Sequence, residues 1–214
     1  MEFHKDGLNI ISKDEYRKIY DSEKEIFNQM VDDYELVLDE TGDLIINKDG
    51  SWMKGAKVIP QPIIVSDSNL FPELNGIDNT MDIDSRNWFS DVFHIDEEFL
   101  NGNYNPLILA YFENGRYQGS VWCTVTNKYV IMYGIKTSLY NYITETKGYA
   151  TKILHAIEEN LMGRKLIILS PLESMVSLLV KNGYIEKIDQ NHVLDSILDY
   201  PHSYVYYAKN LIFK

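Results

Sequence analysis

The fold is decided around Glu145-Thr146-Lys147-Gly148-Tyr149-Ala150, a stretch that opens a helix. An apolar run of β-branched and aromatic residues precedes it, from Tyr129 to Tyr133, and predicts a largely buried strand. After it, apolar residues recur at spacings that place them on one face of a helix. These are Ala150, Ile153, Leu154, Ile157 and Leu161, and Gly163 ends the helix.

A second strand and a second helix follow. Leu166 to Leu169 is a short apolar strand ended by Pro171, and Met175 to Leu179 belongs to a helix that Gly183 closes. The order of elements is therefore strand, glycine turn, helix, strand and helix.

The glycine turn is a candidate anion site. A helix that begins at Lys147-Gly148 leaves its first backbone N–H groups without partners inside the helix, and its dipole makes that end partly positive. Gly148 lacks a Cβ atom, so a phosphate could approach the main chain closely. Lys147 and Lys152 add positive charge. Glycine and alanine also occur at the start of helices that bind nothing, so the turn alone is weak evidence.

The wider spacing resembles that of the GNAT family of acyl-CoA N-acyltransferases. The family's diagnostic segment is Arg/Gln-x-x-Gly-x-Gly/Ala at a helix start, and Gly148 and Ala150 fit it, whereas Glu145 stands in place of Arg or Gln. Leu166 to Leu169 looks like the family's fifth strand. Lys181-Asn182-Gly183-Tyr184 resembles the Lys-x-Gly-Phe that ends the next helix.

The resemblance implies a fold, a reaction and a set of site residues. The implied fold is α/β (α+β), with a mixed, mostly antiparallel sheet flanked by helices. The implied reaction is direct attack of a neutral amine on acetyl-CoA in a ternary complex. Main-chain N–H groups would hold the pyrophosphate, the pantetheine arm would lie between the two central strands, and a strand N–H would polarise the thioester carbonyl. The implied acetyl-CoA-binding residues are Ile135, Thr137, Thr146, Lys147, Gly148, Tyr149, Ala150 and Thr151.

The acid and base of the family are mostly missing from this sequence. Leu179 occupies the position of the family's frequent tyrosine acid and cannot donate a proton. No Asp or Glu lies between Tyr129 and Tyr133, where many members place a base, which leaves Tyr133 as the candidate catalytic residue.

These departures keep other classes of protein open. One is a GNAT-like module that binds CoA or another ligand without transfer. Another is a protein-interaction module of viral origin, because the Asn-, Ile-, Lys- and Tyr-rich usage suggests an AT-rich genome. An unrelated α/β protein is the third alternative.

Composition narrows the function further. With 214 residues, 45% of them hydrophobic, the chain is long enough for one large domain, or for one domain with an extension. A net charge of −12 argues against a nonspecific nucleic-acid binder. A single cysteine, Cys123, permits no internal disulfide. No apolar run approaches the length of a membrane span, and no signal peptide is visible, so we expect no membrane partner and a cytoplasmic protein.

The N-terminal part has no counterpart in the minimal acyltransferase pattern. Ser12 and Glu15 have capping-box spacing and predict the start of a helix, and a strand, turn and strand follow between Tyr34 and Asn47. We therefore expect an N-terminal extension of helix and β-hairpin at residues 1–57, packed on the rest or used to form a homodimer. The GNAT-like acyltransferase domain would span residues 58–214.

The middle of the chain continues the resemblance. Val58 to Val65 predicts an edge strand because of its two prolines. A hairpin around Asn114-Gly115 precedes the strand at Tyr129. Between these, a short helix carries Trp88, Phe89 and Phe93, which in the family would lie over the acceptor site, although aromatic residues of this kind are more often core residues.

Other kinds of chemistry find little support. The five histidines lack metal-ligand spacing, so we expect no metal. Cys123 lies in the middle of a strand beside Trp122 and is interpreted as a small buried hydrophobe. The sequence also shows no evident internal repeat.

Overall fold

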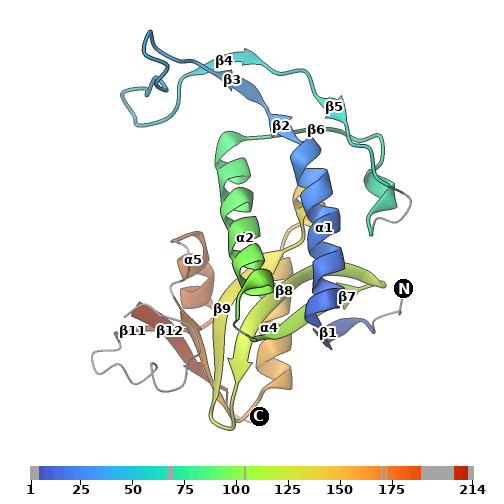
Figure 1. Cartoon of the computed structure of the whole chain (residues 1–214). Coiled ribbons are helices and arrows are strands. Elements are labelled where there is room, and N and C mark those ends of the chain that lie inside the picture. Colours follow the sequence, from blue (N-terminus) through green and yellow to red (C-terminus); the bar gives the residue numbers. More distant parts are fainter. Residues whose placement is uncertain are drawn as a thin grey trace. The chain divides into compact units, whose positions relative to one another are not determined.

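The chain forms two compact units. The computed structural model describes residues 5–66, 70–103, 105–169, 171, 173–188 and 205–211. We call Met1–Arg17 with Phe99–Lys214 the sheet unit, and Lys18–Glu98 the hairpin unit. Helices α1 (Lys13–Gln29) and α2 (Ile83–Asn101) each begin in one unit and end in the other (Figure 1). The division expected between residues 57 and 58 does not coincide with these units.

The described part of the sheet unit is organised around one seven-stranded sheet, in the order β1-β7-β8-β9-β10-β12-β11. Its strands are β1 (Gly7–Ile11), β7 (Leu107–Glu113), β8 (Arg116–Val125), β9 (Tyr129–Thr137), β10 (Lys165–Leu169), β11 (Ile185–Ile188) and β12 (Val205–Asn210). Strands β9 and β10 are parallel, and the other neighbours in the sheet are antiparallel. With helices α3 (Leu139–Ile143), α4 (Tyr149–Asn160) and α5 (Glu173–Lys181), this arrangement confirms the predicted fold class.

Local signals in the sequence mark several elements correctly. Ser12 and Glu15 form the predicted capping box, with the Ser12 N–H at 2.7 Å from Glu15 Oε2 and the Glu15 N–H at 3.2 Å from Ser12 Oγ. Asn114-Gly115 makes the predicted turn between β7 and β8, both residues at positive φ. Strand β1 was missed, although it belongs to the large sheet.

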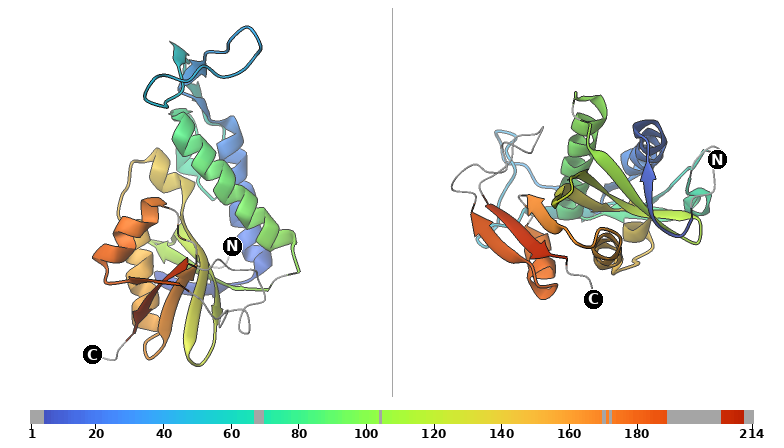
Figure 2. Two further views of the ribbon diagram at one scale, coloured as in Figure 1. Left: turned by 90° about the vertical axis from the view of Figure 1, so that its left-hand side faces the viewer. Right: turned by 90° about the horizontal axis from the view of Figure 1, so that it is seen from below.

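The main core of the sheet unit lies between the sheet and helices α4 and α5. Buried side chains of β7, β8, β9, β10 and β12 pack there against Ile153, Leu154 and Ile157 of α4 and Leu179 of α5. Figure 2 shows these two helices on the same side of the sheet. Because α4 packs against this sheet, its N-terminus is held beside the end of β9.

Aromatic residues cover the opposite face of the sheet. Tyr16, at the start of α1, meets Trp122 of β8 edge to face at 4.9 Å between ring centroids. Phe99, near the end of α2, stacks on the same indole at 5.1 Å. These contacts fix the start of α1 and the end of α2 to the sheet.

In the hairpin unit, α1 and α2 pack through aromatic side chains. The Phe93 ring lies 5.1 Å from Phe27 and 5.7 Å from Tyr20. Arg86 of α2 pairs with Asp32 at 3.2 Å and lies over the Phe27 ring at 5.0 Å. The small strands here are β2 (Val31–Asp32), β3 (Tyr34–Leu36), β4 (Lys54–Lys57), β5 (Gln61–Pro62) and β6 (Asp78–Met81), with a 3-10 turn η1 (Pro72–Leu74).

Two strand predictions in the hairpin unit were wrong in their partners or extent. The hairpin expected between Tyr34–Leu38 and Leu44–Asn47 is present only in part, as the antiparallel bridge between Leu38 and Leu44, while β3 pairs with β4. The expected edge strand from Val58 to Val65 shrinks to β5, which pairs with β6 in a small sheet and not in the large one. Proline removes a ladder donor, which explains the short pairing.

The segment between β3 and β4 contains a short structural repeat, in which Val37, Ile45 and Met53 take equivalent positions. Val37, Ile45 and Met53 form a closed ring of backbone hydrogen bonds, in which Val37 N–H donates to Met53 O at 3.1 Å, Met53 N–H to Ile45 O at 2.8 Å and Ile45 N–H to Val37 O at 3.0 Å. The turns between them carry Gly42 and Gly50, both with φ of 87°. This repeat is hard to recognise in the sequence because the repeated segments share few identical residues besides Gly42 and Gly50.

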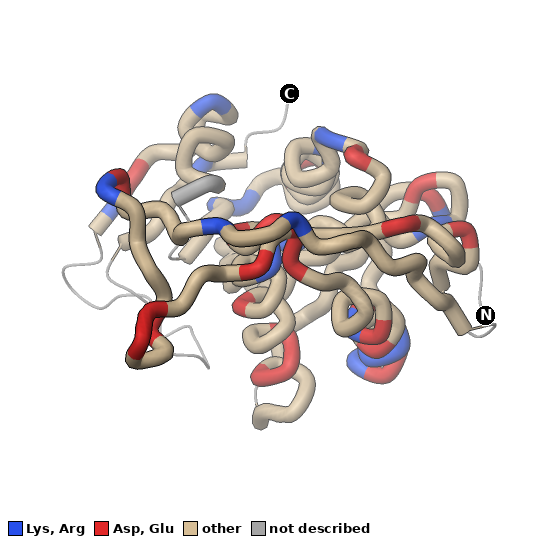
Figure 3. The backbone as a smooth tube through the Cα atoms, turned by 90° about the horizontal axis from the view of Figure 1, so that it is seen from above, with Lys and Arg blue, Asp and Glu red and all other residues tan. Residues whose placement is uncertain are grey.

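Charged side chains occur in both units, but the net charge of the two units differs. Figure 3 shows Asp and Glu interspersed with Lys and Arg along the chain. The net charge of −12 is nevertheless carried by the hairpin unit, which has 19 Asp and Glu against 6 Lys and Arg, whereas the rest of the chain has 13 against 14.

Candidate functional site

The two parallel strands at the centre of the sheet unit pair over only part of their length. Among the described residues, the ladder between β9 and β10 runs from Tyr129–Lys165 to Met132–Ile168, while β9 continues to Thr137. Helices α3 and α4 connect the end of β9 to the start of β10. β9 therefore extends beyond the end of β10 at the end of the sheet where α4 begins, which is the usual place for a ligand beside parallel strands.

A β-bulge directly follows the last residue of β9 that pairs with β10. Cys123 of β8 pairs with Met132 and Trp122 pairs with Gly134, so Tyr133 is the extra residue on β9. The bulge changes which side chains share a face, because both Met132 and Ile135 pack against the core under α4. In a regular strand, two residues three positions apart would point to opposite faces.

The segment from β9 to α4 is held by its own backbone. Ser138 caps α3 by accepting from the Tyr140 N–H at 3.2 Å, and the Thr146 N–H donates to the Asn141 carbonyl at 2.8 Å. Glu145 has φ of 53° and Gly148 has φ of 93°. Two residues in the left-handed region thus turn the chain sharply into α4.

The start of α4 presents a cluster of backbone donors. No hydrogen bond among the described residues uses the N–H of Lys147, Gly148, Tyr149, Ala150 or Thr151, and the first bond of the helix is from Lys152 N–H to Gly148 O at 3.1 Å. Gly148 is the N-cap and supplies no side-chain cap. A Cβ built at Gly148 would have no heavy atom within 4 Å, so the space before the helix is open. Donors in this arrangement fit a phosphate group.

One glycine brings the end of β9 and α4 together. Gly119 of β8 pairs with Thr137, and a Cβ built on Gly119 would lie 2.6 Å from Ile153 Cδ1 of α4. The helix therefore lies directly on the backbone near the start of β8 and the end of β9. Of the predicted acetyl-CoA-binding residues, this places Thr137 beside α4, with Ile135 on the α4 face of β9; their contact with a ligand stays a prediction.

The side chains of the first turn of α4 are tied to β7. Lys152 Nζ lies 2.9 and 3.1 Å from the two carboxylate oxygens of Glu113, and the Tyr149 hydroxyl donates to the same carboxylate. The hydrogen bond from Lys152, and next that from Tyr149, hold the pKa of Glu113 below its usual value. Burial and the bond to Glu113 raise the pKa of Tyr149 to about 12. Sequence reasoning missed Glu113, which lies far from the motif in the chain.

Tyr133 lies on the face of the sheet opposite α4. Its hydroxyl is 2.6 Å from Thr124 Oγ1, and its ring is 5.7 Å from Phe99. The side chain is half-buried. A catalytic role for Tyr133 stays a prediction.

Two residues considered for proton or acyl transfer are part of the core. Leu179 is completely buried against the sheet, so no proton donor stands at that position of α5. Cys123 is also buried, and burial raises the pKa of its thiol to about 12. A thiolate at Cys123 is therefore unfavourable at neutral pH, in agreement with its interpretation as a small hydrophobe.

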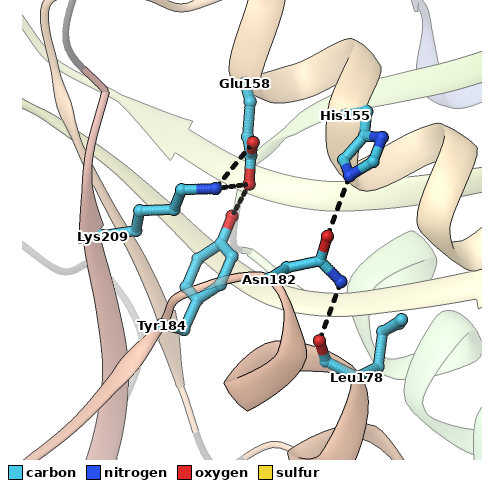
Figure 4. Close-up of polar contacts among 6 residues, drawn as sticks. All are labelled: His155, Glu158, Leu178, Asn182, Tyr184 and Lys209. Atoms are coloured by element: carbon cyan, nitrogen blue, oxygen red, sulfur yellow. Dashed lines mark hydrogen bonds and ion pairs between the residues drawn. The ribbon is translucent and has the colours of Figure 1, made fainter.

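Lys181-Asn182-Gly183-Tyr184, the second motif of the sequence, lies at the end of α5 and contacts α4 at His155 and Glu158 (Figure 4). The Tyr184 hydroxyl donates to Glu158 of α4 at 2.8 Å, and Lys209 of β12 lies 2.8 and 2.9 Å from the same carboxylate. Asn182 donates to the Leu178 carbonyl and accepts from His155 Nε2, each at 2.8 Å. Tyrosine in place of the family's phenylalanine thus adds a polar contact to α4.

We expect Glu158→Gln to lower the free energy of unfolding by about 1–2 kcal/mol, because it removes the charge that two donors share. The pair is largely shielded, with 28% of the Lys209 side chain and 17% of the Glu158 side chain exposed. Urea denaturation measures the effect. Glu159→Gln is the matched control, since Glu159 is exposed and should change stability by less than about 0.5 kcal/mol. Equal stability of the two variants would contradict the anchoring role.

The predicted acceptor-site aromatics pack within the hairpin unit. Phe89 is 3% exposed and Phe93 is fully buried, and Trp88 meets Phe89 edge to face at 4.7 Å. Phe93 contacts Phe27 and Tyr20 of α1, as expected of a core residue. A role of these three residues toward an acceptor stays a prediction.

Neither metal ligands nor a membrane helix are found in the described ranges. Within residues 5–211, apart from the undescribed gaps, no three His, Cys, Asp or Glu side chains could hold a metal ion together. No helix in the described part of the chain has the length and apolar character needed to cross a membrane.

Comparisons with known proteins identify similar folds but no family model. No protein-family model matches the sequence, and a search of curated proteins found no match. Tetrahymena GCN5 is 12% identical with a TM-score of 0.38, over 57% of this chain and 80% of that one. The acetyltransferase of the GNAT family from Streptococcus pneumoniae is 16% identical with a TM-score of 0.32, over 58% and 76%. An aminoglycoside 6'-N-acetyltransferase complexed with coenzyme A is 12% identical with a TM-score of 0.35, over 60% and 86%.

Proposed function

We propose that this protein is an acyl-CoA-dependent N-acyltransferase that transfers an acetyl group from acetyl-CoA to an amine in a ternary complex. One observation carries the proposal. The ladder between β9 and β10 stops at Met132, next to the bulge at Tyr133, and β9 runs on to the end of the sheet where α4 begins with five backbone N–H groups that have no partner among the described residues.

Groups of this chain would bind acetyl-CoA in two places. The N–H groups of Lys147 to Thr151, together with the helix dipole, suit the pyrophosphate of acetyl-CoA. The part of β9 that extends beyond β10 suits the pantetheine arm, which can bond to a strand edge. The bulge at Tyr133 re-aims the backbone of β9 at the depth where the thioester would lie.

In the reaction, the acceptor nitrogen attacks the thioester carbonyl carbon. A C–N bond forms, the C–S bond breaks, the amine loses one proton and the thiolate of CoA gains one. Holding amine and thioester together supplies much of the rate enhancement in such a reaction. Tyr133 is the side chain we assign to proton transfer, since it is the bulged residue itself; Tyr133→Phe would test this assignment by lowering kcat while leaving acetyl-CoA binding intact.

A second candidate is a GNAT-like module that binds CoA without transfer. The buried Leu179 favours it, because α5 then offers no acid for the leaving thiolate. Both candidates require acetyl-CoA binding. They differ in whether CoA is released when an amine is present.

Calorimetric titration with acetyl-CoA, followed by a thiol-release assay, separates these outcomes. The assay uses a panel of primary amines that contains polyamines, amino sugars and peptides with a free N-terminus. Binding with amine-dependent thiol release supports the acyltransferase. Binding without release for every amine favours the non-catalytic module, and no binding contradicts both.

A further inference from the structure

A carboxylate sits at the end of α4 where the proposed function requires an anion to bind. Glu113, the last residue of β7, accepts from both Lys152 and Tyr149 in the first turns of α4. Lys152 Nζ also lies 4.5 Å from the centre of the Tyr149 ring. Because side chains on a helix lean toward its N-terminus and Lys152 follows Gly148 by four residues, we expect its ammonium to be within reach of a ligand held by the unpartnered N–H groups.

We propose that Glu113 competes with the phosphates of the bound ligand for Lys152, and so weakens the site's affinity for anions. This inference rests on the proposed function and extends it by naming a residue that sets the affinity for acetyl-CoA. The free protein keeps the Lys152 ammonium on Glu113. A phosphate held by the N–H groups of α4 offers the same ammonium a second, more highly charged partner.

The groups around the Lys152–Glu113 pair, its charge state and its exposure to solvent all bear on this competition. Arg116, across the hairpin from Glu113, donates to the Tyr140 hydroxyl at 2.7 Å and lies over that ring at 4.5 Å. Glu113 remains charged at neutral pH because its pKa is held below its usual value, first by Lys152 and then by Tyr149. The Lys152 and Glu113 side chains are 48% and 30% exposed, so a ligand can reach the pair from solvent.

The test is calorimetric titration of acetyl-CoA into Glu113→Gln. Glutamine keeps the shape and an oxygen acceptor for Tyr149 but removes the charge that holds Lys152. We expect acetyl-CoA to bind roughly two- to five-fold more tightly, as befits a partly exposed ion pair. The gain should shrink as salt is raised, because it is electrostatic.

A double-mutant cycle distinguishes competition from a structural role. Lys152→Gln added to Glu113→Gln should abolish the gain, since the released ammonium is then absent. Glu159→Gln removes an exposed charge farther along α4 and should leave affinity unchanged. Equal or weaker binding by folded Glu113→Gln, or a gain that survives the loss of Lys152, overturns the inference.

A measurement on the unmodified protein covers the case in which Glu113→Gln does not fold. The carboxyl ¹³C resonance of Glu113 should shift when acetyl-CoA saturates the protein, because Lys152 leaves it. An unchanged resonance in the saturated protein overturns the inference and leaves the proposed function standing. Absence of any acetyl-CoA binding to the wild type overturns the proposed function, and this inference with it.

Discussion

Gly148→Asp is expected to weaken acetyl-CoA binding by at least about 100-fold, or ~2.7 kcal/mol. The aspartate would place a carboxylate in the open space in front of α4, where the backbone donors would otherwise meet a pyrophosphate. Its own oxygen could also cap those donors, as aspartate does at many helix starts. Both effects remove the same anion site. Calorimetric titration measures the loss.

Backbone strain must be separated from the loss of the anion site, because Gly148 has φ of 93°. Gly183→Asp is the matched control, since Gly183 has φ of 82° and a Cβ there would also meet nothing within 4 Å. Both variants should lose similar stability. Only Gly148→Asp should lose binding, and a folded Gly148→Asp protein with wild-type affinity would refute the anion site.

Gly119→Ala is expected to cost about 2–4 kcal/mol of unfolding free energy, although it adds a single methyl group. A Cβ at this position would lie 2.3 Å from the Lys136 carbonyl oxygen and 2.6 Å from Ile153 Cδ1. The first of these neighbours is backbone in the middle of the sheet and cannot move alone. The methyl group would therefore force α4 away from β8 and β9, or break the register between these strands.

Gly134→Ala is the matched control for this packing argument. Gly134 lies on the neighbouring strand β9, and a Cβ there would meet nothing within 4 Å. We expect a change of less than about 1 kcal/mol. Similar denaturation midpoints for the two variants, with unchanged slopes, would show that α4 is not packed on Gly119 as described.

The sequence predicts the central elements well because each leaves a local pattern. The apolar run at Tyr129, the periodic face of α4 and the glycine of its N-cap are all visible without tertiary context, and the structure has each of them. The Asn114-Gly115 turn and the Ser12 capping box are likewise local.

The features that shape the candidate site are not local, and the sequence did not reveal them. The bulge at Tyr133 exists only in the register between β8 and β9, and the adjacent Gly134 was its one available signal. Glu113 reaches α4 only because β7 lies beside β8 in the sheet. Strand β1 escaped notice because a five-residue strand before a helix carries little periodicity of its own.

Amide NMR tests the central claim most directly. The account predicts that titration with CoA shifts the ¹H–¹⁵N signals of Lys147 to Thr151 most strongly, through new hydrogen bonds to the pyrophosphate, and that pantetheine, which lacks phosphate, leaves these signals nearly unchanged. Saturation with CoA that leaves the five amides unmoved, or equal shifts from pantetheine, would contradict it.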